Sequence, residues 1–260
     1  MRIRIVVVLP AAFGPRKPTT SPFAISNVTF EVAKGEVVGF LGPNGAGKTT
    51  TMRILTGYLP PTAGSASVGG FDLGVDPRSA KRVTGYLPES PPLYPEMRVH
   101  EYLSYVAALH DVPRGERRER VARALASCGL EKVSERVVRT LSKGYRQRVG
   151  LAQAIVHDPP VLILDEPTAG LDPIQIAEIR ELIRRLAAEE GRTVILSTHI
   201  LAEVDAICQR VLLIAYGELR LDARIDALRA QGSLEQVFVR EVQAATEKVA
   251  AAKPAAEVRA

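Results

Sequence analysis

A glycine-rich loop of defined spacing constrains this chain more than any other feature of its sequence. The loop reads Gly42, Pro43, Asn44, Gly45, Ala46, Gly47, Lys48 and Thr49, which fits the pattern Gly-x-x-x-x-Gly-Lys-Ser/Thr. A β-rich run over residues 36–41 precedes the loop, and helix-forming residues from Lys48 to Leu59 follow it. A strand, a glycine loop and a helix in this order are typical of a site that surrounds a triphosphate with backbone N–H groups.

Three side chains of this loop have separate expected roles. We expect Lys48 to reach the β- and γ-phosphates and Thr49 to ligate Mg²⁺ through its hydroxyl, and Thr50 to help hold the α-phosphate. The glycines allow the backbone to curve closely around the phosphates, and the positive end of the following helix adds to the attraction. The loop therefore predicts a nucleoside triphosphate and Mg²⁺ as the bound groups.

Two acidic residues end an apolar run later in the chain. The run Val161–Leu164 continues into Asp165 and Glu166, and Pro167 prevents the strand from continuing. Ligands of open α/β sheets bind at the carboxyl ends of the strands, so these acids should meet the phosphate loop. Asp165 is suited to holding hydrated Mg²⁺, and Glu166 to orienting or deprotonating an attacking water. Without the phosphate loop, the same pair would be interpreted as a solvated turn.

One histidine stands just beyond the next strand-like run. Residues 193–197 form that run, and His199 follows it at the position where an imidazole contacts a γ-phosphate or the attacking water. The other three histidines lack such a setting, and the two cysteines stand far apart without metal-ligand spacing. We therefore predict Glu166, His199 and Lys48 as the catalytic residues.

The pattern of apolar runs predicts an α/β fold. Strand-like runs at residues 161–164, 193–196 and 211–214 alternate with helical segments, which indicates a mostly parallel sheet covered on both faces. An antiparallel β edge is expected near residues 28–32 and 64–74. Strand signals vanish over about residues 91–158, which predicts an inserted all-helical subdomain. The main domain then covers residues 28–230. It lies between an atypical segment 1–27, which we expect to be loosely packed or differently built, and a short helix with a flexible tail over 231–260.

Charge and hydropathy argue against a nucleic-acid-binding, a membrane-spanning and a secreted protein. The chain has 34 Lys and Arg against 29 Asp and Glu, giving a net charge of +5, but the basic residues are interleaved with acidic ones. No apolar run approaches the roughly 18 residues that a membrane-spanning helix needs. The opening resembles a secretory signal only superficially, because its apolar run, residues 5–9, has five residues. We do not expect nucleic acid as a partner.

The segment Leu141–Arg148 resembles the signature motif of the ABC superfamily. Together with the phosphate loop, the two acids and His199, it makes residues 28–240 similar to the ATP-binding subunit of an ABC transporter, of the subfamily that serves exporter-type permeases of the multidrug and gliding-motility kind. The resemblance implies a P-loop NTPase fold, in which Ser142 and Gly144 begin a helix that binds the γ-phosphate held by the other subunit. Lys143 replaces a frequent glycine and Tyr145 a frequent glutamine.

The resemblance assigns three further positions. Residues 169–172 are similar to the loop where two subunits touch near the hydrolytic site, and Asp172 before a proline is also a good helix N-cap. Glu89 stands where the family usually has a glutamine that ligates Mg²⁺ and senses the permease, and it adds a negative charge there. The aromatic residue that stacks on adenine is Phe13, which precedes a glycine, or else Phe23.

The resemblance also implies partners. One phosphate loop and one signature occur in the chain, and a composite site needs one of each from different subunits, so a homodimer or a paired ATPase subunit is expected. Separate transmembrane permease subunits would carry the cargo without contact to this chain, which would lie in the cytoplasm on the inner face of the membrane. Residues 91–97 are either the docking edge or a plain turn.

Two other functions remain open from the sequence. A soluble ABC ATPase acting on nucleic acid or the ribosome would fit the basic charge, although such relatives usually carry long coiled-coil insertions or two cassettes. A nucleotide-binding protein without turnover would fit the loop alone. The cargo and the direction of transport are not encoded in recognisable residues.

Overall fold

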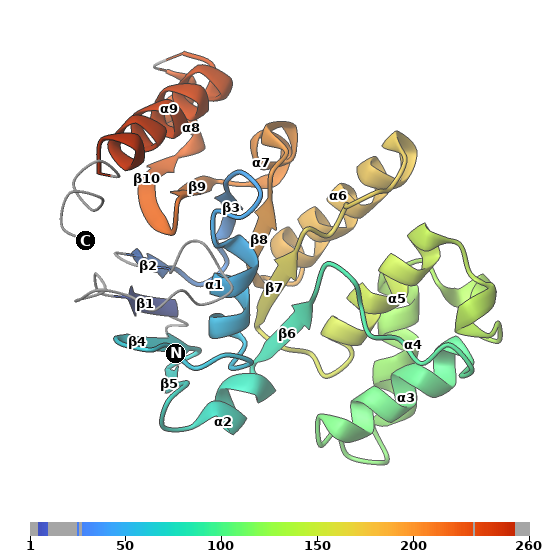
Figure 1. Ribbon diagram of the computed structural model, residues 1–260. Coiled ribbons are helices and arrows are strands. Elements are labelled where there is room, and N and C mark those ends of the chain that lie inside the picture. The colour runs from blue at the N-terminus through green and yellow to red at the C-terminus, as the bar shows by residue number, and fades with distance from the viewer. Residues whose placement is uncertain (1–4, 10–24, 26–27, 231, 253–260) are drawn as a thin grey trace.

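The computed structural model describes residues 5–9, 25, 28–230 and 232–252 of the 260-residue chain. Its described part contains two β-sheets and a group of helices that lies to one side of the larger sheet (Figure 1). The larger sheet has six strands in the order β10-β9-β3-β8-β7-β6, and the smaller has four in the order β2-β1-β4-β5. The α/β class and the mostly parallel sheet are as predicted.

The six-stranded sheet carries the strand ends where the sequence predicts the site. In spatial order its strands are β10 (Glu218–Arg224), β9 (Arg210–Ala215), β3 (Val37–Leu41), β8 (Thr193–Thr198), β7 (Val161–Asp165) and β6 (Thr84–Leu87). Every neighbouring pair is parallel except β9 with β10. Because β3, β7 and β8 are parallel neighbours, their carboxyl ends meet at one edge.

Successive residues of the central strands face two different hydrophobic cores. In β7, Val161 and Ile163 belong to the core shared with the smaller sheet, whereas Leu162 and Leu164 belong to the core shared with the surrounding helices. Side chains of a strand point alternately to the two faces of the sheet, so a strand covered on both faces must be apolar throughout. This is why the run is continuous rather than alternating.

The smaller sheet is antiparallel and packs with helix α1 (Lys48–Leu55) against the larger one. Its strands are β2 (Val28–Val32), β1 (Ile5–Leu9), β4 (Ser65–Val68) and β5 (Phe71–Asp72), and helix α2 (Pro77–Arg82) follows. Helix α1 contacts β4 on one side and β7 and β8 on the other, which places it between the sheets. The expected antiparallel edge is therefore present, with more strands than the sequence suggested.

Strand β1 belongs to the segment 1–27, which we expected to be atypical and either loosely packed or differently built. Of its residues, Ile5–Leu9 lie inside the small sheet, paired antiparallel with both β2 and β4. The short apolar run that superficially resembles a secretory signal is thus a central strand, since its backbone has hydrogen-bonding neighbours on both sides.

The inserted subdomain is helical, as predicted. It contains helices α3 (Val99–Leu109), α4 (Arg117–Ser127) and α5 (Lys143–Ile155) and the 3₁₀ turns η1 (Glu131–Val133) and η2 (Val138–Thr140). Residues 91–158 contain no strand, only one isolated bridge between Arg98 and Val137. Helix α5 packs on β6 and so connects the subdomain to the six-stranded sheet.

The remaining helices are α6 (Pro173–Ala188), α7 (Leu201–Ile207), α8 (Ile225–Arg229) and α9 (Leu234–Ala252). Helix α9 packs on β9, β10, α7 and α8, and it extends to Ala252, so the C-terminal helix is longer than the short one that we expected. Within the described chain, no helix combines the length and the apolar character that crossing a bilayer requires.

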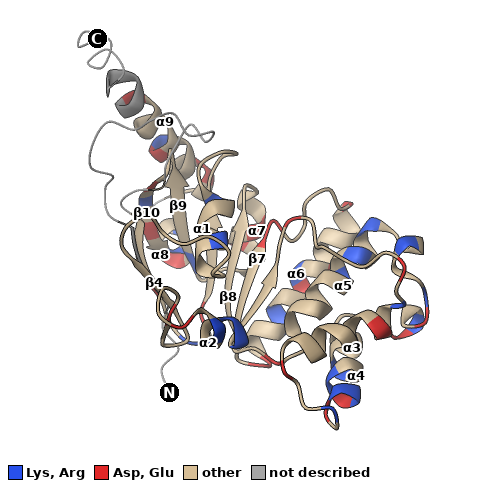
Figure 2. Cartoon of the chain, turned by 60° about the horizontal axis from the view of Figure 1, so that its bottom comes forward, with Lys and Arg blue, Asp and Glu red and all other residues tan. Residues whose placement is uncertain are grey.

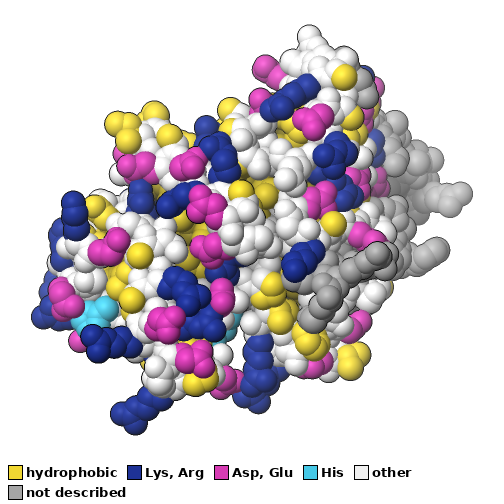
Figure 3. Space-filling model, turned by 180° about the vertical axis from the view of Figure 1, so that it is seen from behind, with side chains coloured by type: hydrophobic (Ala, Val, Ile, Leu, Met, Phe, Trp, Pro, Cys, Tyr) yellow, Lys and Arg dark blue, Asp and Glu magenta, His cyan; other side chains and the backbone are white. Residues whose placement is uncertain are grey.

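Charged side chains of both signs are interspersed over the surface. Figure 2 shows basic and acidic residues side by side on α4 and α6. The face of the molecule that lies behind the view of Figure 1 shows the same mixture in space-filling form (Figure 3). Basic and acidic residues are therefore mixed on the folded surface, as they are along the sequence.

Candidate functional site

The phosphate loop connects the end of β3 to the first turn of α1, as its sequence predicts. Gly45 and Gly47 adopt φ angles of 79° and 110°, in the left-handed region that favours glycine. A Cβ atom on Gly42 would lie 2.3 Å from the carbonyl oxygen of Ile214, so only glycine fits there without displacing β9. The glycines of the loop are thus required by its backbone path.

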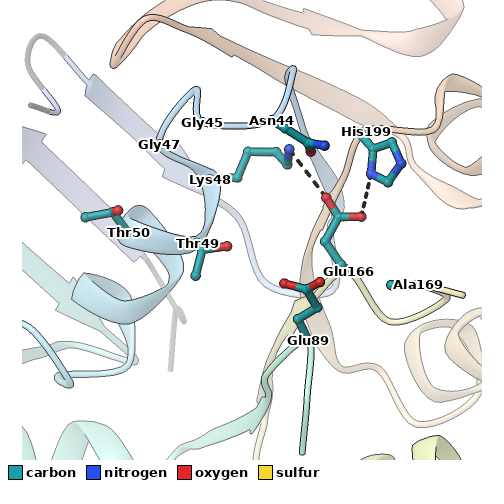
Figure 4. A pocket seen from close by; sticks show the side chains of 10 residues that line it. All are labelled: Asn44, Gly45, Gly47, Lys48, Thr49, Thr50, Glu89, Glu166, Ala169 and His199. Carbon is teal, nitrogen blue, oxygen red and sulfur yellow. Dashed lines mark hydrogen bonds and ion pairs between the residues drawn. The ribbon is translucent and has the colours of Figure 1, made fainter. Parts of the chain in front are cut away.

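Lys48 is a buried cation at the start of α1, with a side chain 6% exposed. Its Nζ donates hydrogen bonds to the carbonyl oxygens of Gly42 at 2.8 Å and Pro43 at 3.3 Å. The same Nζ lies 3.4 Å from Oε1 of Glu166 (Figure 4). A buried charge is tolerated when it is paired and hydrogen-bonded in this way.

Glu166 follows β7 and links Lys48 to His199. Its Oε2 lies 2.9 Å from Nδ1 of His199, on the side opposite Lys48 (Figure 4). The Glu166 backbone has a φ of 48°, unusual for a side chain of this size, and its N–H donates to the carbonyl and hydroxyl oxygens of Ser197. The three predicted catalytic residues therefore form one continuous chain of contacts.

Asp165 has the surroundings of a cation ligand. Its Oδ1 accepts hydrogen bonds from the hydroxyls of Ser197 and of Thr49, the latter at 3.3 Å. Its Oδ2 is buried and has no hydrogen-bond partner among the described residues. A buried carboxylate oxygen without a donor, next to a threonine hydroxyl, fits a hard cation such as Mg²⁺, which is commonly held by one or two carboxylates together with substrate phosphates.

These groups line one pocket of about 400 Å³. Its lining residues are Asn44, Gly45, Gly47, Lys48, Thr49, Thr50, Glu89, Glu166, Ala169 and His199. Glu89 lies on the segment after β6 and faces the same space as Glu166, whereas Thr50 points away from Glu166 (Figure 4). Gly42, Pro43 and Ala46 belong to the loop but not to the pocket lining. Residues from four separate parts of the sequence thus meet here.

Ser142 and Gly144 lie in a second pocket, of about 470 Å³, which has no lining residue in common with the first. Ser142 is the N-cap of α5, and its Oγ accepts a hydrogen bond from the N–H of Tyr145 at 3.4 Å. A Cβ on Gly144 would lie 2.6 Å from Oε1 of Gln175, so a larger residue there would displace the end of the Gln175 side chain on α6. The other lining residues are Gly129, Glu131, Lys132, Tyr145, Arg148, Gln175 and Glu178.

Asp172 caps helix α6. Its Oδ1 accepts hydrogen bonds from the N–H groups of Ile174 at 3.0 Å and Gln175 at 2.9 Å, and Pro173 occupies the first helical turn. This confirms the N-cap that the sequence predicts. Asp172 lines neither of the two pockets. Phe13 and Phe23, the two candidates for stacking on adenine, lie outside the described residues.

Two histidines and both cysteines lie outside the phosphate pocket, in buried or half-buried surroundings. His110 and His157 stack with ring centroids 3.7 Å apart, and burial lowers the pKa of both, that of His157 to about 3. Both cysteines are buried and free, and burial raises the pKa of the Cys128 thiol to about 12. A thiol with so high a pKa stays protonated at neutral pH and is therefore a poor nucleophile.

Sequence reasoning missed one residue of the site, Ser197, whose hydroxyl donates to Asp165 and accepts from the N–H of Glu166. Ala169, which lines the pocket, belongs to the loop 169–172 that the resemblance singles out. Ser197 is the register partner of Asp165 in the β7–β8 pairing, so a correct strand alignment would have identified it. Such an alignment is not available from single strands taken separately.

A phosphate loop between β3 and α1, two acids at the end of β7 and a histidine beyond β8 define a phosphate-loop nucleotide-binding domain that carries an inserted helical subdomain. Comparison with known proteins identifies its family. The model of the family described as "ABC transporter" matches residues 25–169, which is more than half of the chain. The chain belongs to this family, which confirms the resemblance that its motifs carry.

Individual relatives support the assignment of this chain to the family. The uncharacterized ABC transporter ATP-binding protein YdbJ of Bacillus subtilis is 39% identical over 212 residues, covering 82% of this chain and 68% of that protein. The linearmycin resistance ATP-binding protein LnrL of the same organism is 36% identical over 195 residues, covering 75% and 62%. The probable multidrug ABC transporter ATP-binding protein YbhF of Escherichia coli is 34% identical over 224 residues, covering 83% and 38%. The aligned part of the chain thus spans between 38% and 68% of these three relatives.

Solved structures show the same fold. An ATP-binding subunit of an ABC transporter superimposes with a TM-score of 0.79 at 31% identity, covering 92% of this chain and 99% of that one. CbiO1 from Clostridium perfringens, part of the ABC transporter complex cbiONQ, gives a TM-score of 0.76 at 28% identity, covering 94% and 96%. The predicted fold class, an ABC-type P-loop fold, is confirmed.

Proposed function

We propose that this chain binds ATP with Mg²⁺ and hydrolyses it as one of two paired ATPase subunits, and that the cycle of pairing and separation drives a transmembrane permease. The observation that carries the proposal is the chain of contacts from Lys48 through Glu166 to His199 at the phosphate loop. It brings a phosphate-binding cation, a carboxylate and an imidazole to one pocket, the groups that cleavage of a γ-phosphate by water requires.

In this proposal the loop N–H groups and Lys48 bind the β- and γ-phosphates, and Glu166 orients the attacking water and accepts its proton. The water oxygen bonds to the γ-phosphorus while the bond to the β-phosphate oxygen breaks, which yields ADP and inorganic phosphate. Thr49, Asp165 and Glu89 would hold the magnesium ion, which supplies neutralisation of phosphate charge when bound. His199 contacts Glu166 now and is within reach of the γ-phosphate region.

The separation of the two pockets supports the pairing of two subunits. Ser142 and Gly144, at the N-terminus of α5, would offer the backbone N–H groups and the positive end of that helix to an anion, but their pocket is distinct from that of Lys48. We infer that the N-terminus of α5 completes the phosphate site of a second copy or of a related subunit. ATP then bridges the two chains, and loss of the γ-phosphate removes the bridge. Asp172 and the preceding loop would lie at this contact.

The relatives support a transporter and an export role. LnrL is named for linearmycin resistance, and YbhF as a probable multidrug ABC transporter protein. We propose that the permease subunits dock on residues 91–97, where Tyr94 is 51% exposed, and that the chain lies on the cytoplasmic face of the membrane. The cargo would contact only the permease.

The test is ATP turnover by the purified chain, alone and with its permease. Glu166→Gln should lower phosphate release by at least about a hundredfold, because an amide does not accept the proton of water. The same variant should give a stable nucleotide-bound dimer in light scattering. Glu181→Gln, at an exposed acid of α6 that pairs with Arg184, is the matched control and should leave turnover unchanged. Wild-type turnover in Glu166→Gln would contradict the proposal.

A further inference from the structure

Helix α7 carries a buried carboxylate that the mechanism above does not use. This residue, Glu203, is 1% exposed. Helix α7 begins at Leu201, two residues after His199. Oε1 of Glu203 accepts a hydrogen bond from the hydroxyl of Thr168, and its Oε2 accepts one from the hydroxyl of Thr198 at 2.7 Å. The nearest cation is the guanidinium of Arg180 on α6, at 3.9 Å. A single acid therefore joins two loop segments that are 30 residues apart in sequence.

Each of these threonines is next to a predicted catalytic residue. Thr168 lies in the turn that follows Glu166, which is closed by a hydrogen bond from the N–H of Ala169 to the Glu166 carbonyl at 3.1 Å. Thr198 immediately precedes His199, and its Oγ1 also accepts a hydrogen bond from the N–H of Ile200 at 3.1 Å. The carboxylate of Glu203 thus fixes the backbone on both sides of the Glu166–His199 contact.

These hydrogen bonds stabilise the unusual backbone conformation of Glu166. A backbone φ of 48° is costly for a glutamate and persists only when the surrounding structure imposes it. One side is imposed by Ser197, which accepts the Glu166 N–H, and the other by the turn that Thr168 anchors. Burying a carboxylate costs desolvation free energy that an apolar side chain of similar size would not cost. For Glu203 this cost is offset only by its two hydroxyl donors and by Arg180.

We propose that Glu203 is a positioning residue for ATP hydrolysis: through Thr168 and Thr198 it holds Glu166 and His199 at contact distance. The inference rests on the proposed function, since it assigns Glu203 a part in the chemistry of Glu166. Glu203 itself does not line the pocket that holds Lys48, Glu166 and His199. Its loss therefore acts on turnover through geometry and leaves the phosphate-binding groups in place.

The test compares Glu203→Gln with Asp205→Asn in the purified full chain. Glutamine keeps the shape of the side chain but replaces one acceptor oxygen by an NH₂ donor, so one of the two threonine hydroxyls can no longer donate its proton to residue 203 and has to reorient. Asp205 lies on the same helix, is about half exposed and pairs with Arg229, remote from either threonine contact. We expect Glu203→Gln to lower kcat about ten- to a hundredfold, with KM and ATP affinity within about twofold of wild type, and Asp205→Asn to change neither.

A double-mutant cycle separates positioning from general destabilisation. Thr168→Val and Thr198→Val each remove one hydroxyl donor, and each should lower kcat by an amount that does not add to that of Glu203→Gln, because all three remove the same anchor. Additive losses, or a loss of kcat matched by the fraction of unfolded protein in a denaturation curve, would overturn the proposal. Wild-type kcat in Glu203→Gln would also overturn it.

A measurement that does not depend on ATP turnover distinguishes the positioning role of Glu203 from the proposed function. The ring signals of His199 in a nuclear magnetic resonance spectrum, assigned with His199→Gln, should move in Glu203→Gln in the direction that Glu166→Gln moves them, and stay in place in Asp205→Asn. Unmoved His199 signals would refute the positioning role. If wild-type protein hydrolyses no ATP while the signals move as expected, the proposed function fails and the anchoring of His199 by Glu203 stands.

Discussion

Ser197 offers a stability prediction whose size follows from its contacts. It is fully buried at the end of β8, opposite Asp165 in the sheet register. Its hydroxyl donates to Oδ1 of Asp165 and accepts from the N–H of Glu166 at 3.2 Å. Ser197→Ala removes both bonds and leaves the backbone of β8 unchanged, so the effect isolates the hydroxyl.

The expected loss is about 2 kcal/mol in the free energy of unfolding. A hydrogen bond to a charged group contributes about 1.5–3 kcal/mol. The lower part of this range applies because Thr49 still donates to Asp165 at 3.3 Å, and the Glu166 N–H still donates to the Ser197 carbonyl at 3.1 Å. For a chain of this size a loss of 2 kcal/mol lowers the melting temperature by about 4–8 °C.

Equilibrium unfolding in urea, followed by circular dichroism, measures this loss. Ser104→Ala is the control, because Ser104 is an exposed residue of α3, and it should change the free energy by less than about 0.5 kcal/mol. If Ser197→Ala were as stable as Ser104→Ala, the hydroxyl would not hold the two acids, and the account of how β8 supports the site would be refuted.

Three further predictions concern other parts of the chain. Gly85→Ala places a Cβ 2.1 Å from the carbonyl oxygen of Ala154, so β6 and α5 must separate, and urea unfolding should show a loss of about 3 kcal/mol; an unchanged midpoint would contradict the close packing. Because burial lowers the pKa of His157 to about 3, the unfolded chain binds a proton that the folded chain excludes, and the unfolding free energy should fall as the pH drops from about 6.5 towards 3. The slope is about 1.4 kcal/mol per pH unit, and His157→Gln should flatten it; parallel curves for both proteins would show that His157 is not the group responsible. Glu89→Gln removes a negative charge near Asp165 and should raise the Mg²⁺ concentration for half-maximal turnover about threefold, and an identical Mg²⁺ dependence would exclude Glu89 from the metal site.

Local sequence patterns predicted much of the fold. The phosphate loop fixes a strand before it and a helix after it, and Pro173 after Asp172 predicts the start of α6 at the residue where it is found. The helical subdomain was recognisable because strand signals stop over a long stretch. In each case neighbouring residues carry the information, so long-range contacts are not needed.

Features that depend on distant pairing were missed. Strand β1 pairs with β4, which is about sixty residues away along the chain, and its apolar run alone does not indicate that pairing. The contacts of Ser197 and Glu203 likewise arise from the register of β7 with β8 and from the docking of α7. Candidate residues at strand ends were predictable by type, whereas the hydroxyls and the acid that hold them depend on tertiary structure.

The measurement that tests the central claim most directly is complementation between two defective chains. Lys48→Ala removes the phosphate-binding cation and Ser142→Arg blocks the N-terminus of α5, so each purified variant should be inactive in ATP turnover. If each site combines Lys48 of one chain with Ser142 of another, an equimolar mixture should recover about a quarter of wild-type activity, since half of the randomly formed pairs contain one intact site of two. No recovery in a mixture shown to contain mixed dimers, or full activity of Ser142→Arg alone, would contradict the shared site.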